Sequence, residues 1–364
     1  MRICAVWLAL GLGLVAGMPG HAADGAVRLA LPALDMAKIN AEDSAVFAKN
    51  RRLRFAIGRD VHYAPGKQGG WIDASDGTST WRVQIDAPDA VHLNFGFSRF
   101  HLPPSAKLTI RSADQKSQLG PFGETDNQAS GQLWTALLAG NSALLELTVK
   151  TAERQRVDVL LTRVNQGYRG FGSAPKQCKS GACNTDVACL ADSDPWNEQR
   201  RAVAAITVSG TDTCTGSLVN NTSGDRRLLF ATATHCEITG ANVASVLAYF
   251  NYESPTCRTP GSAASGIRLP MPNTTLRGLA FLAATNNPFE GTSPGETRSD
   301  WTLIELAPDA NQANLNLFWA GWDRSPPPTI CSAPASPSAT AGLCASIHHP
   351  SVDEKRITFV ESTM

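Results

Sequence analysis

Apolar and polar residues alternate through three segments in the first half of the chain. The segments are TWRVQID (80–86), AVHLNFGFSRF (90–100) and SALLELTVK (142–150). A repeat of two residues is typical of strands with one buried face. Prolines and glycines between the segments mark turns. The pattern predicts a compact all-β unit, a β-sandwich, that ends near Phe171.

One helix is expected ahead of these strands, over residues 34–52. Leu34, Ile39, Val46 and Phe47 form a loose apolar stripe at helical spacing in this stretch. We find no repeat with a solenoid period anywhere in the chain.

A second series of short strands is predicted after residue 196. Its segments are AVAAITVSG, CTGSLVNN, RRLLFATAT, SVLAYFNY, DWTLIEL, LNLFWAGW and KRITFV. Short strands separated by turns, without helices between them, favour β-barrels over a parallel sheet. Residues 173–196 contain Pro, Gly, Ser and three cysteines without a period, so they are expected to link the two units.

The first 23 residues have the pattern of a secretory signal peptide. One Arg precedes an apolar run at 5–18, and small residues lead to an expected cut between Ala22 and Asp24. The alternative is a membrane anchor, but the run is shorter than the roughly 20 residues that span a bilayer. We therefore expect export to the periplasm or the medium, with no membrane contact after cleavage.

Charge and cysteine content limit the partners. The chain has 32 basic and 32 acidic side chains, so no bulk field attracts nucleic acid. Eight of the nine cysteines lie between Cys178 and Cys344, and residues 24–177 have none. Behind an export signal this clustering indicates disulfides. The cysteine spacings lack the paired pattern of a zinc site, so no metal or other cofactor is expected.

His235 is the first candidate for chemistry, since it directly precedes Cys236 at the end of an apolar strand. A histidine beside a cysteine is more often structural than catalytic. Asp300, before another apolar strand, would by itself be a turn or cap residue. His348 and His349 invite a metal-site interpretation, for which a structural role is the simpler alternative.

A series of motifs in this chain resembles the lysyl endopeptidase family of chymotrypsin-like serine proteases. The motifs occur in order between Cys183 and Ile357: ACNTDVAC, CTGSLVNN, ATATHC, YFNYESPTCR, SDWTLIEL, NLFWAGWDR and IHHPSVDEKRI. The earlier LNFGFSRFHLP, GQLWT and NQGYRGF resemble the amino-terminal pro-region of the same family.

The resemblance implies a role for both candidates. His235 matches the general base and Asp300 matches the carboxylate that orients it. Such a carboxylate fixes the imidazole tautomer and stabilises the imidazolium that forms during attack. The family also carries a similar HHP loop without metal, which favours the structural role for His348 and His349.

Disulfides and processing follow from the same resemblance. It pairs Cys214 with Cys236 and Cys189 with Cys257, and the first bridge, closing about 22 residues, is worth roughly 3 kcal/mol in the chain-entropy model. Cys331 and Cys344 flank a low-complexity stretch, and a disulfide between them would close it into a surface loop. Cys178 and Cys183 have no assigned partners. Two lysines precede the expected start of the mature chain and are candidate processing sites: Lys176 and Lys179.

The third member of a catalytic triad is not found. Such chains run His, Asp, Ser, with the nucleophile roughly 90 residues beyond the carboxylate, and 64 residues follow Asp300. No serine there lies in a glycine-rich turn that would supply an oxyanion hole; the serines are Ser325, Ser332, Ser336, Ser338, Ser346, Ser351 and Ser362. We expect a truncated chain whose second barrel, beginning near Asn311, is incomplete.

The sequence thus predicts an all-β protein in four parts: signal (1–23), pro-region (24–172), linker (173–196) and protease domain (197–364). Its expected function is that of a secreted, monomeric serine endopeptidase precursor that cuts proteins after Lys or Arg and is inactive as it stands. The alternative is a non-catalytic β-rich binding, chaperone or inhibitor product. A third class, a hydrolase using Cys236 or the histidine pair, is disfavoured because Cys236 is better explained by a disulfide.

Overall fold

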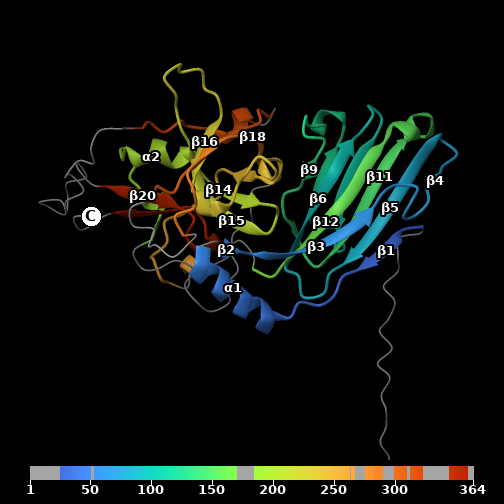
Figure 1. Ribbon diagram of the computed structural model, residues 1–364, viewed down its shortest axis with the longest axis horizontal. Helices are drawn as coiled ribbons and strands as arrows, with labels where there is room; N and C mark the ends of the chain where they lie inside the picture. Colours follow the sequence, from blue (N-terminus) through green and yellow to red (C-terminus); the bar gives the residue numbers. More distant parts are fainter. Residues whose placement is uncertain are drawn as a thin grey trace, which may run out of the picture.

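The computed structural model describes residues 25–50, 53–169, 184–262, 264–266, 275–289, 299–309, 312–322 and 344–359. Within these ranges most regular structure is β-strand, which confirms the predicted all-β class. Figure 1 shows two β-rich bodies side by side: the first half of the chain on the right and the second half on the left. In the described residues no helix is long and apolar enough to cross a membrane.

The first body is a sandwich of two sheets. One sheet has the order β1-β5-β11-β7-β8, with β4 paired to β5. Its strands are β1 (Val27–Ala30), β4 (Ile72–Asp73), β5 (Thr78–Asp86), β7 (Lys107–Ser112), β8 (Gln118–Phe122) and β11 (Ser142–Lys150). The other has the order β10-β6-β12-β3, with β9 on β6. Its strands are β3 (Ala56–Tyr63), β6 (His92–His101), β9 (Leu133–Trp134), β10 (Leu138–Ala139) and β12 (Asp158–Gly167).

The alternation read from the sequence explains the sandwich core. Along β5 and β11 every second residue is buried, so the two strands direct Trp81, Val83, Leu145 and their neighbours to the same side. Phe95 and other residues of β6 complete the same buried cluster. The core between the sheets therefore follows from the two-residue repeat.

One long helix, α1 (Met36–Asn50), lies beneath the second body in Figure 1. Asp35 caps it, because the Lys38 backbone N–H donates to Asp35 Oδ1 at 3.0 Å. Asp43 on this helix accepts from the Tyr168 hydroxyl at 2.5 Å and pairs with Arg54 at 2.8 Å. These contacts tie α1 to both ends of the sandwich chain, and the predicted helix over 34–52 is two residues longer at each end.

The second body is built on a closed barrel of six strands. The order is β14-β17-β18-β19-β16-β15, and β15 pairs back onto β14. The strands are β14 (Val203–Val208), β15 (Asp212–Leu218), β16 (Leu229–Thr232), β17 (Leu247–Tyr249), β18 (Leu276–Ala284) and β19 (Thr302–Leu306). Phe230, Phe250 and Ile304 fill the interior, with the two rings edge to face at 6.3 Å. A short strand from the first body, β2 (Leu53–Arg54), adds to β15.

A small third sheet has the order β13-β21-β20. Its strands are β13 (Thr185–Asp186), β20 (Ala345–His348) and β21 (Arg356–Phe359). In the described part of the chain, β20 and β21 are the strands that follow residue 311, where the second barrel was expected to begin.

The remaining helices are short. They are α2 (Trp196–Gln199) and the 3₁₀ helices η1 (Glu124–Asp126), η2 (Thr151–Arg156), η3 (Val187–Cys189), η4 (Arg200–Ala202), η5 (Thr234–Cys236), η6 (Val243–Ser245), η7 (Ala264–Gly266), η9 (Gln312–Leu315) and η10 (Pro350–Val352).

One predicted strand is wrong. LNLFWAGW is not a strand: its first residue ends η9, and its remaining residues make only an isolated bridge between Ala320 and Val219. Leu315 belongs to the buried barrel cluster, and Leu317, Phe318, Trp319 and Ala320 are partly buried against it.

Of the strands described after residue 196, two were not predicted, β18 and β20. β18 carries exposed apolar residues such as Leu279 and Phe281, so it lacks a clean alternation. In the first half, the named segments correspond to β5, β6 and β11, and the other strands of the sandwich were not named individually.

Candidate active site

The candidate site lies where three barrel strands end. Thr232, the last residue of β16, pairs with Thr302, the first of β19, and Thr302 also pairs with Ala284 at the end of β18. In antiparallel strands the residue after one strand and the residue before its partner meet at the same edge. The register therefore brings His235 and Asp300 together, although 65 residues separate them.

His235 and Asp300 form a bonded pair, which we call the dyad. Nδ1 of His235 lies 2.6 Å from Oδ2 of Asp300, and the His235 backbone N–H donates to Oδ1 at 3.1 Å. An ionised carboxylate only accepts, so Nδ1 carries the proton and Nε2 keeps its lone pair on the far side of the ring. Both side chains are about a quarter exposed (24% and 23%), so the ring remains accessible to a reactant.

Neighbouring residues hold the dyad loops together. The Thr234 hydroxyl donates to the Trp301 carbonyl at 2.7 Å and lies 2.9 Å from the Thr285 hydroxyl. The ring of Phe289 meets the His235 ring edge to face at 5.7 Å. Sequence reasoning missed these three contacts, since a threonine beside a histidine carries no distinctive pattern. They fix the loop after β16 against the segments that flank β18 and β19.

The Cys214–Cys236 disulfide braces the same loop from the other side. It joins β15 to the residue that follows His235. Cys214, His235 and Cys236 lie close enough to suggest a metal site, with ligand atoms within 4.8 Å. Both sulfurs are bonded to each other, so neither supplies the thiolate that a metal would need. The cluster is therefore a brace for His235.

A second disulfide, Cys189–Cys257, lies beside a buried ion network. Asp186 is fully buried. It accepts a hydrogen bond from Arg258 Nη2 at 2.7 Å and forms an ion pair with Arg356 Nη1 at 2.6 Å. The pairing raises the pKa of Arg258, with the hydrogen bond to Asp186 as the largest cause. This network binds β13 to β21 and was not read from the sequence, where a DEKR run resembles an exposed charged turn.

Of the remaining predicted disulfide and processing residues, the structure describes only Cys344. Cys344 is disulfide-bonded, and its expected partner Cys331 lies outside the described residues. Four other predicted residues also lie outside them: Cys178, Cys183, Lys176 and Lys179.

His349 is structural rather than part of the dyad. Its ring stacks on Tyr252 at 5.8 Å, and Nδ1 lies 3.1 Å from the Asp353 carbonyl oxygen. Burial, together with the charge of Lys355, lowers the pKa of His349 to about 3. His348, beside it on β20, also has a lowered pKa because of burial. The His349 ring is therefore buried in a packed environment that disfavours its charged form. The structural role of the HHP loop stays a prediction.

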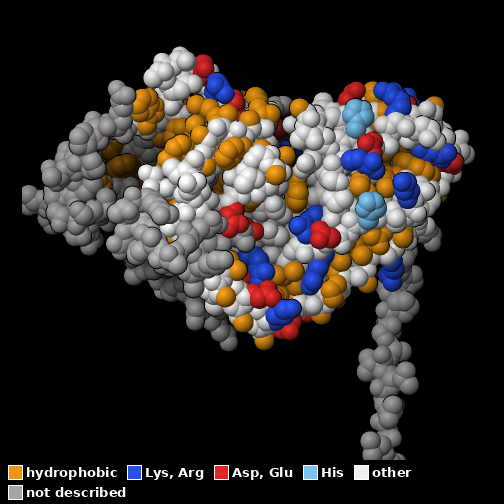
Figure 2. All heavy atoms as spheres, viewed as in Figure 1, with side chains coloured by type: hydrophobic (Ala, Val, Ile, Leu, Met, Phe, Trp, Pro, Cys, Tyr) orange, Lys and Arg blue, Asp and Glu red, His pale blue; other side chains and the backbone are white. Residues whose placement is uncertain are grey.

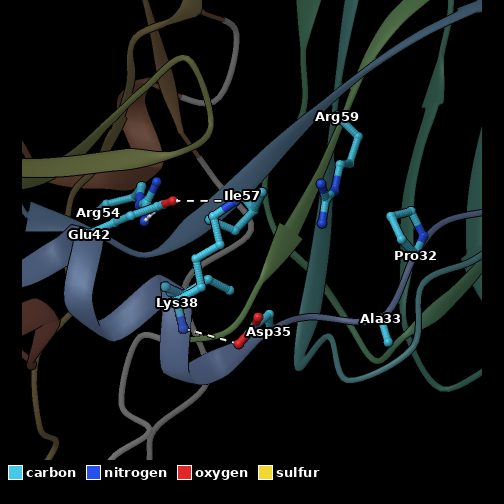
Figure 3. Close-up of a pocket in the computed structure, with 9 residues that line it drawn as sticks. Pro32, Ala33, Asp35, Lys38, Glu42, Arg54, Ile57 and Arg59 are labelled. Carbon is cyan, nitrogen blue, oxygen red and sulfur yellow. Dashed lines mark hydrogen bonds and ion pairs between the residues drawn. The ribbon is translucent and has the colours of Figure 1, made fainter.

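A pocket of about 390 Å³ lies elsewhere, between α1 and β3 (Figure 3). Its lining includes Lys38, Arg54 and Arg59, which would favour an anion. However, Arg54 already pairs with Glu42 at 3.0 Å, and the Arg59 Nε donates to Gln166 at 2.7 Å. Two of the pocket's cations are thus already bonded within the protein. The face in Figure 2 likewise intermingles basic and acidic side chains rather than gathering one sign.

Comparison with known proteins decides the family. The family model described as "Lysyl endopeptidase, C-terminal domain" matches residues 178–364, and "Lysyl endopeptidase N-terminal domain" matches residues 29–166. The chain belongs to the lysyl endopeptidase family. The family boundary between 166 and 178 falls between the sandwich and the barrel.

One curated member of this family is a lysyl endopeptidase of Pseudomonas aeruginosa. It is 26% identical over 308 residues, covering 79% of this chain and 58% of the relative. The chain therefore spans less than two thirds of that relative's length. Among solved structures, PliG, a periplasmic inhibitor of g-type lysozyme from Aeromonas hydrophila, matches at 12% identity and a TM-score of 0.18. That match covers 39% of this chain and 96% of PliG.

Replacing Asp300 with Asn should change the tautomer of His235. An amide can donate to Nδ1, so the ring proton is expected to move to Nε2 in a substantial fraction of molecules. Nitrogen-15 NMR of the histidine rings measures the two forms. Asp225→Asn, on the exposed β15–β16 turn, is the matched control and should change nothing. An undiminished Nδ1–H form in Asp300→Asn would contradict the proposed geometry.

The buried His349 should make the fold acid-sensitive. The folded protein keeps this ring neutral down to about pH 3, whereas the unfolded chain binds a proton below about 6.5. The free energy of unfolding should therefore fall by about 1.4 kcal/mol per pH unit from this group as pH drops through that window. Urea unfolding at several pH values measures it. The slope should flatten in His349→Phe but not in His101→Phe, an exposed control; equal slopes would refute it.

Proposed function

We propose that this chain is the precursor part of a secreted serine endopeptidase that cleaves proteins after Lys or Arg. His235 serves as the general base and Asp300 as its orienting carboxylate. The observation that carries the proposal is the 2.6 Å contact between His235 Nδ1 and Asp300 Oδ2, in a chain of this family. The basic-residue preference rests on the family alone, because the described residues include no assigned specificity pocket.

The chemistry of the dyad follows from its geometry. Nε2 accepts the proton of a serine hydroxyl as its oxygen attacks the substrate carbonyl carbon, and Asp300 stabilises the imidazolium. The imidazolium then gives its proton to the leaving amine as the peptide bond breaks. Water, deprotonated by the same nitrogen, releases the acyl group and restores the serine. We assign the serine and its oxyanion donors to residues not contained in this sequence, so the 364 residues alone should be inactive.

The domain organisation follows the same proposal. Residues 1–23 would be a signal peptide, 24–172 a pro-region, 173–196 a processing region and 197–364 the protease domain. Two disulfides, Cys214–Cys236 and Cys189–Cys257, support an oxidising, extracytoplasmic destination. We expect a monomer whose partners are protein or peptide substrates, with no cofactor.

A second candidate is a non-catalytic role for the β-rich first half, as a chaperone, an inhibitor or a binding module. The sandwich favours it, because it has an apolar core of its own between its two sheets.

Hydrolysis of a lysyl or arginyl peptide ester tests the assignment. The refolded 364-residue chain should give no turnover above that of its His235→Ala variant, because a base without a nucleophile forms no acyl-enzyme. Turnover that disappears in His235→Ala would show that this chain already contains a nucleophile. His101→Ala, at an exposed position on the sandwich, serves as the control substitution.

Processing can be tested on secreted material of a catalytically competent version. A lysine-cutting enzyme should release its own pro-region at Lys176 or Lys179, so the mature chain should begin close after one of them. Amino-terminal sequencing gives the position. A first residue far from 177–180 would count against self-processing, and Lys176→Gln with Lys179→Gln should abolish it.

A further inference from the structure

The five residues that follow β18, residues 285–289, lie against the dyad. β18 ends at Ala284, which pairs with Thr302 at the start of β19. The segment then contributes two contacts to the site, one from the Thr285 hydroxyl and one from the Phe289 ring. It is therefore part of the site as well as the exit from the strand.

Thr285 fixes the start of this segment to the residue that follows Asp300. The Thr285 backbone N–H donates to the Trp301 carbonyl at 3.0 Å, and the Thr285 hydroxyl oxygen accepts from the Trp301 backbone N–H at 3.1 Å. The Thr234 hydroxyl donates to the same carbonyl at 2.7 Å. The main chain beside Asp300 is thus held through both of its polar groups.

A tight turn sets the position of Phe289. The Asn287 side-chain oxygen accepts from the Phe289 backbone N–H at 3.0 Å, an arrangement typical of asparagine in turns. Pro288 lies between them, is buried, and has its φ angle fixed by its own ring. The turn therefore restricts the path of the backbone that carries the Phe289 ring.

The Phe289 ring meets the imidazole of His235 edge to face. The ring centroids are 5.7 Å apart, and the ring planes are inclined at 72°. This geometry is favourable because the positive edge of one ring points at the negative face of the other. Phe289 belongs neither to the buried barrel cluster nor to the residues packed against it, so packing of the barrel core does not account for its position.

The other supports of the site leave the imidazole free to rotate. The disulfide at Cys236 and the Thr234 hydroxyl act on the main chain of the loop, whereas the ring turns about its own side-chain torsions, the second of which is broad. Two contacts act on the ring itself: the bond from Nδ1 to Asp300 and the edge of Phe289. Phe289 opposes rotation away from Asp300, because that rotation would give up the ring contact.

We propose that Phe289 is a positioning residue for His235, whose ring keeps the imidazole in the orientation in which Nδ1 faces Asp300. The catalytic meaning of this orientation rests on the proposed function, in which Nε2 receives the proton of a serine. The orientation itself needs no nucleophile, so it can be measured in the 364-residue chain whatever the ester assay shows.

The test is the tautomer of His235 in Phe289→Ala, measured by nitrogen-15 NMR at a pH at which the ring is neutral. A ring that turns away from Asp300 loses the acceptor of its Nδ1 proton, so the Nε2–H form becomes accessible. The ratio of the Nδ1–H form to the Nε2–H form should fall roughly 2- to 10-fold, the range that corresponds to loss of one aromatic pair. An unchanged ratio would overturn the proposal.

Two further variants separate positioning from a general effect on the fold. Phe289→Tyr keeps the aromatic edge and should retain the ratio of the unsubstituted chain. Phe281→Ala removes a ring that is 36% exposed on β18, and this matched control should change nothing. Equal ratios in Phe289→Ala and Phe281→Ala would reject Phe289 as the restraint, as would a ratio in Phe289→Tyr as low as that in Phe289→Ala.

Folding is checked by circular dichroism and thermal unfolding of each variant. If Phe289→Ala does not fold, Phe289→Leu replaces it, because leucine keeps apolar volume but has no aromatic edge. A ratio in Phe289→Leu equal to that of the unsubstituted chain would then overturn the proposal.

Discussion

The pairing of β16 with β19 is the constraint on which the rest of the site depends. Four residue pairs set this register, from Leu229 with Glu305 to Thr232 with Thr302. A shift of one residue would turn every side chain to the opposite face of the sheet and expose Phe230 and Ile304. The barrel core therefore enforces the register, and the register brings His235 to Asp300. Burial of apolar side chains in the barrel thus fixes the relative position of His235 and Asp300 at its edge.

His235 and Asp300 lie in loops, outside the hydrogen-bonded strands. A disulfide and side-chain hydrogen bonds therefore restrict these loops. The disulfide beside His235 limits the loop on one side, and the Thr234 hydroxyl ties it to Trp301 on the other. A positioned base needs its ring fixed within a few tenths of an ångström of productive geometry. The same bridge connects this loop to β15, whose first residues bind β2. The dyad and the sandwich thus share one structural element.

A buried network of charged side chains joins β13 to β21 in the small third sheet. Asp186 pairs with both Arg258 and Arg356 in the interior, where removal of one partner would leave an uncompensated charge. Such a network favours one pairing of β13 with β21 over alternatives, because any other arrangement would bury ions without partners. In the described residues this small sheet has no large apolar core of its own, so ionic pairing takes over the role that packing has in the barrel.

The β-rich class of each half and the pairing of His235 with Asp300 were predictable from the sequence. Alternation along β5 and β11 predicts strands because side-chain direction depends only on neighbouring residues, and the family motifs around His235 and Asp300 predict their roles. Three features became visible only in the folded chain: where LNLFWAGW packs, how the DEKR run becomes a buried network, and that Asn94 and Asn165 donate hydrogen bonds to a turn more than 40 residues away along the chain. Those features depend on partners distant in sequence, and a local pattern contains no information about which distant surface will cover it.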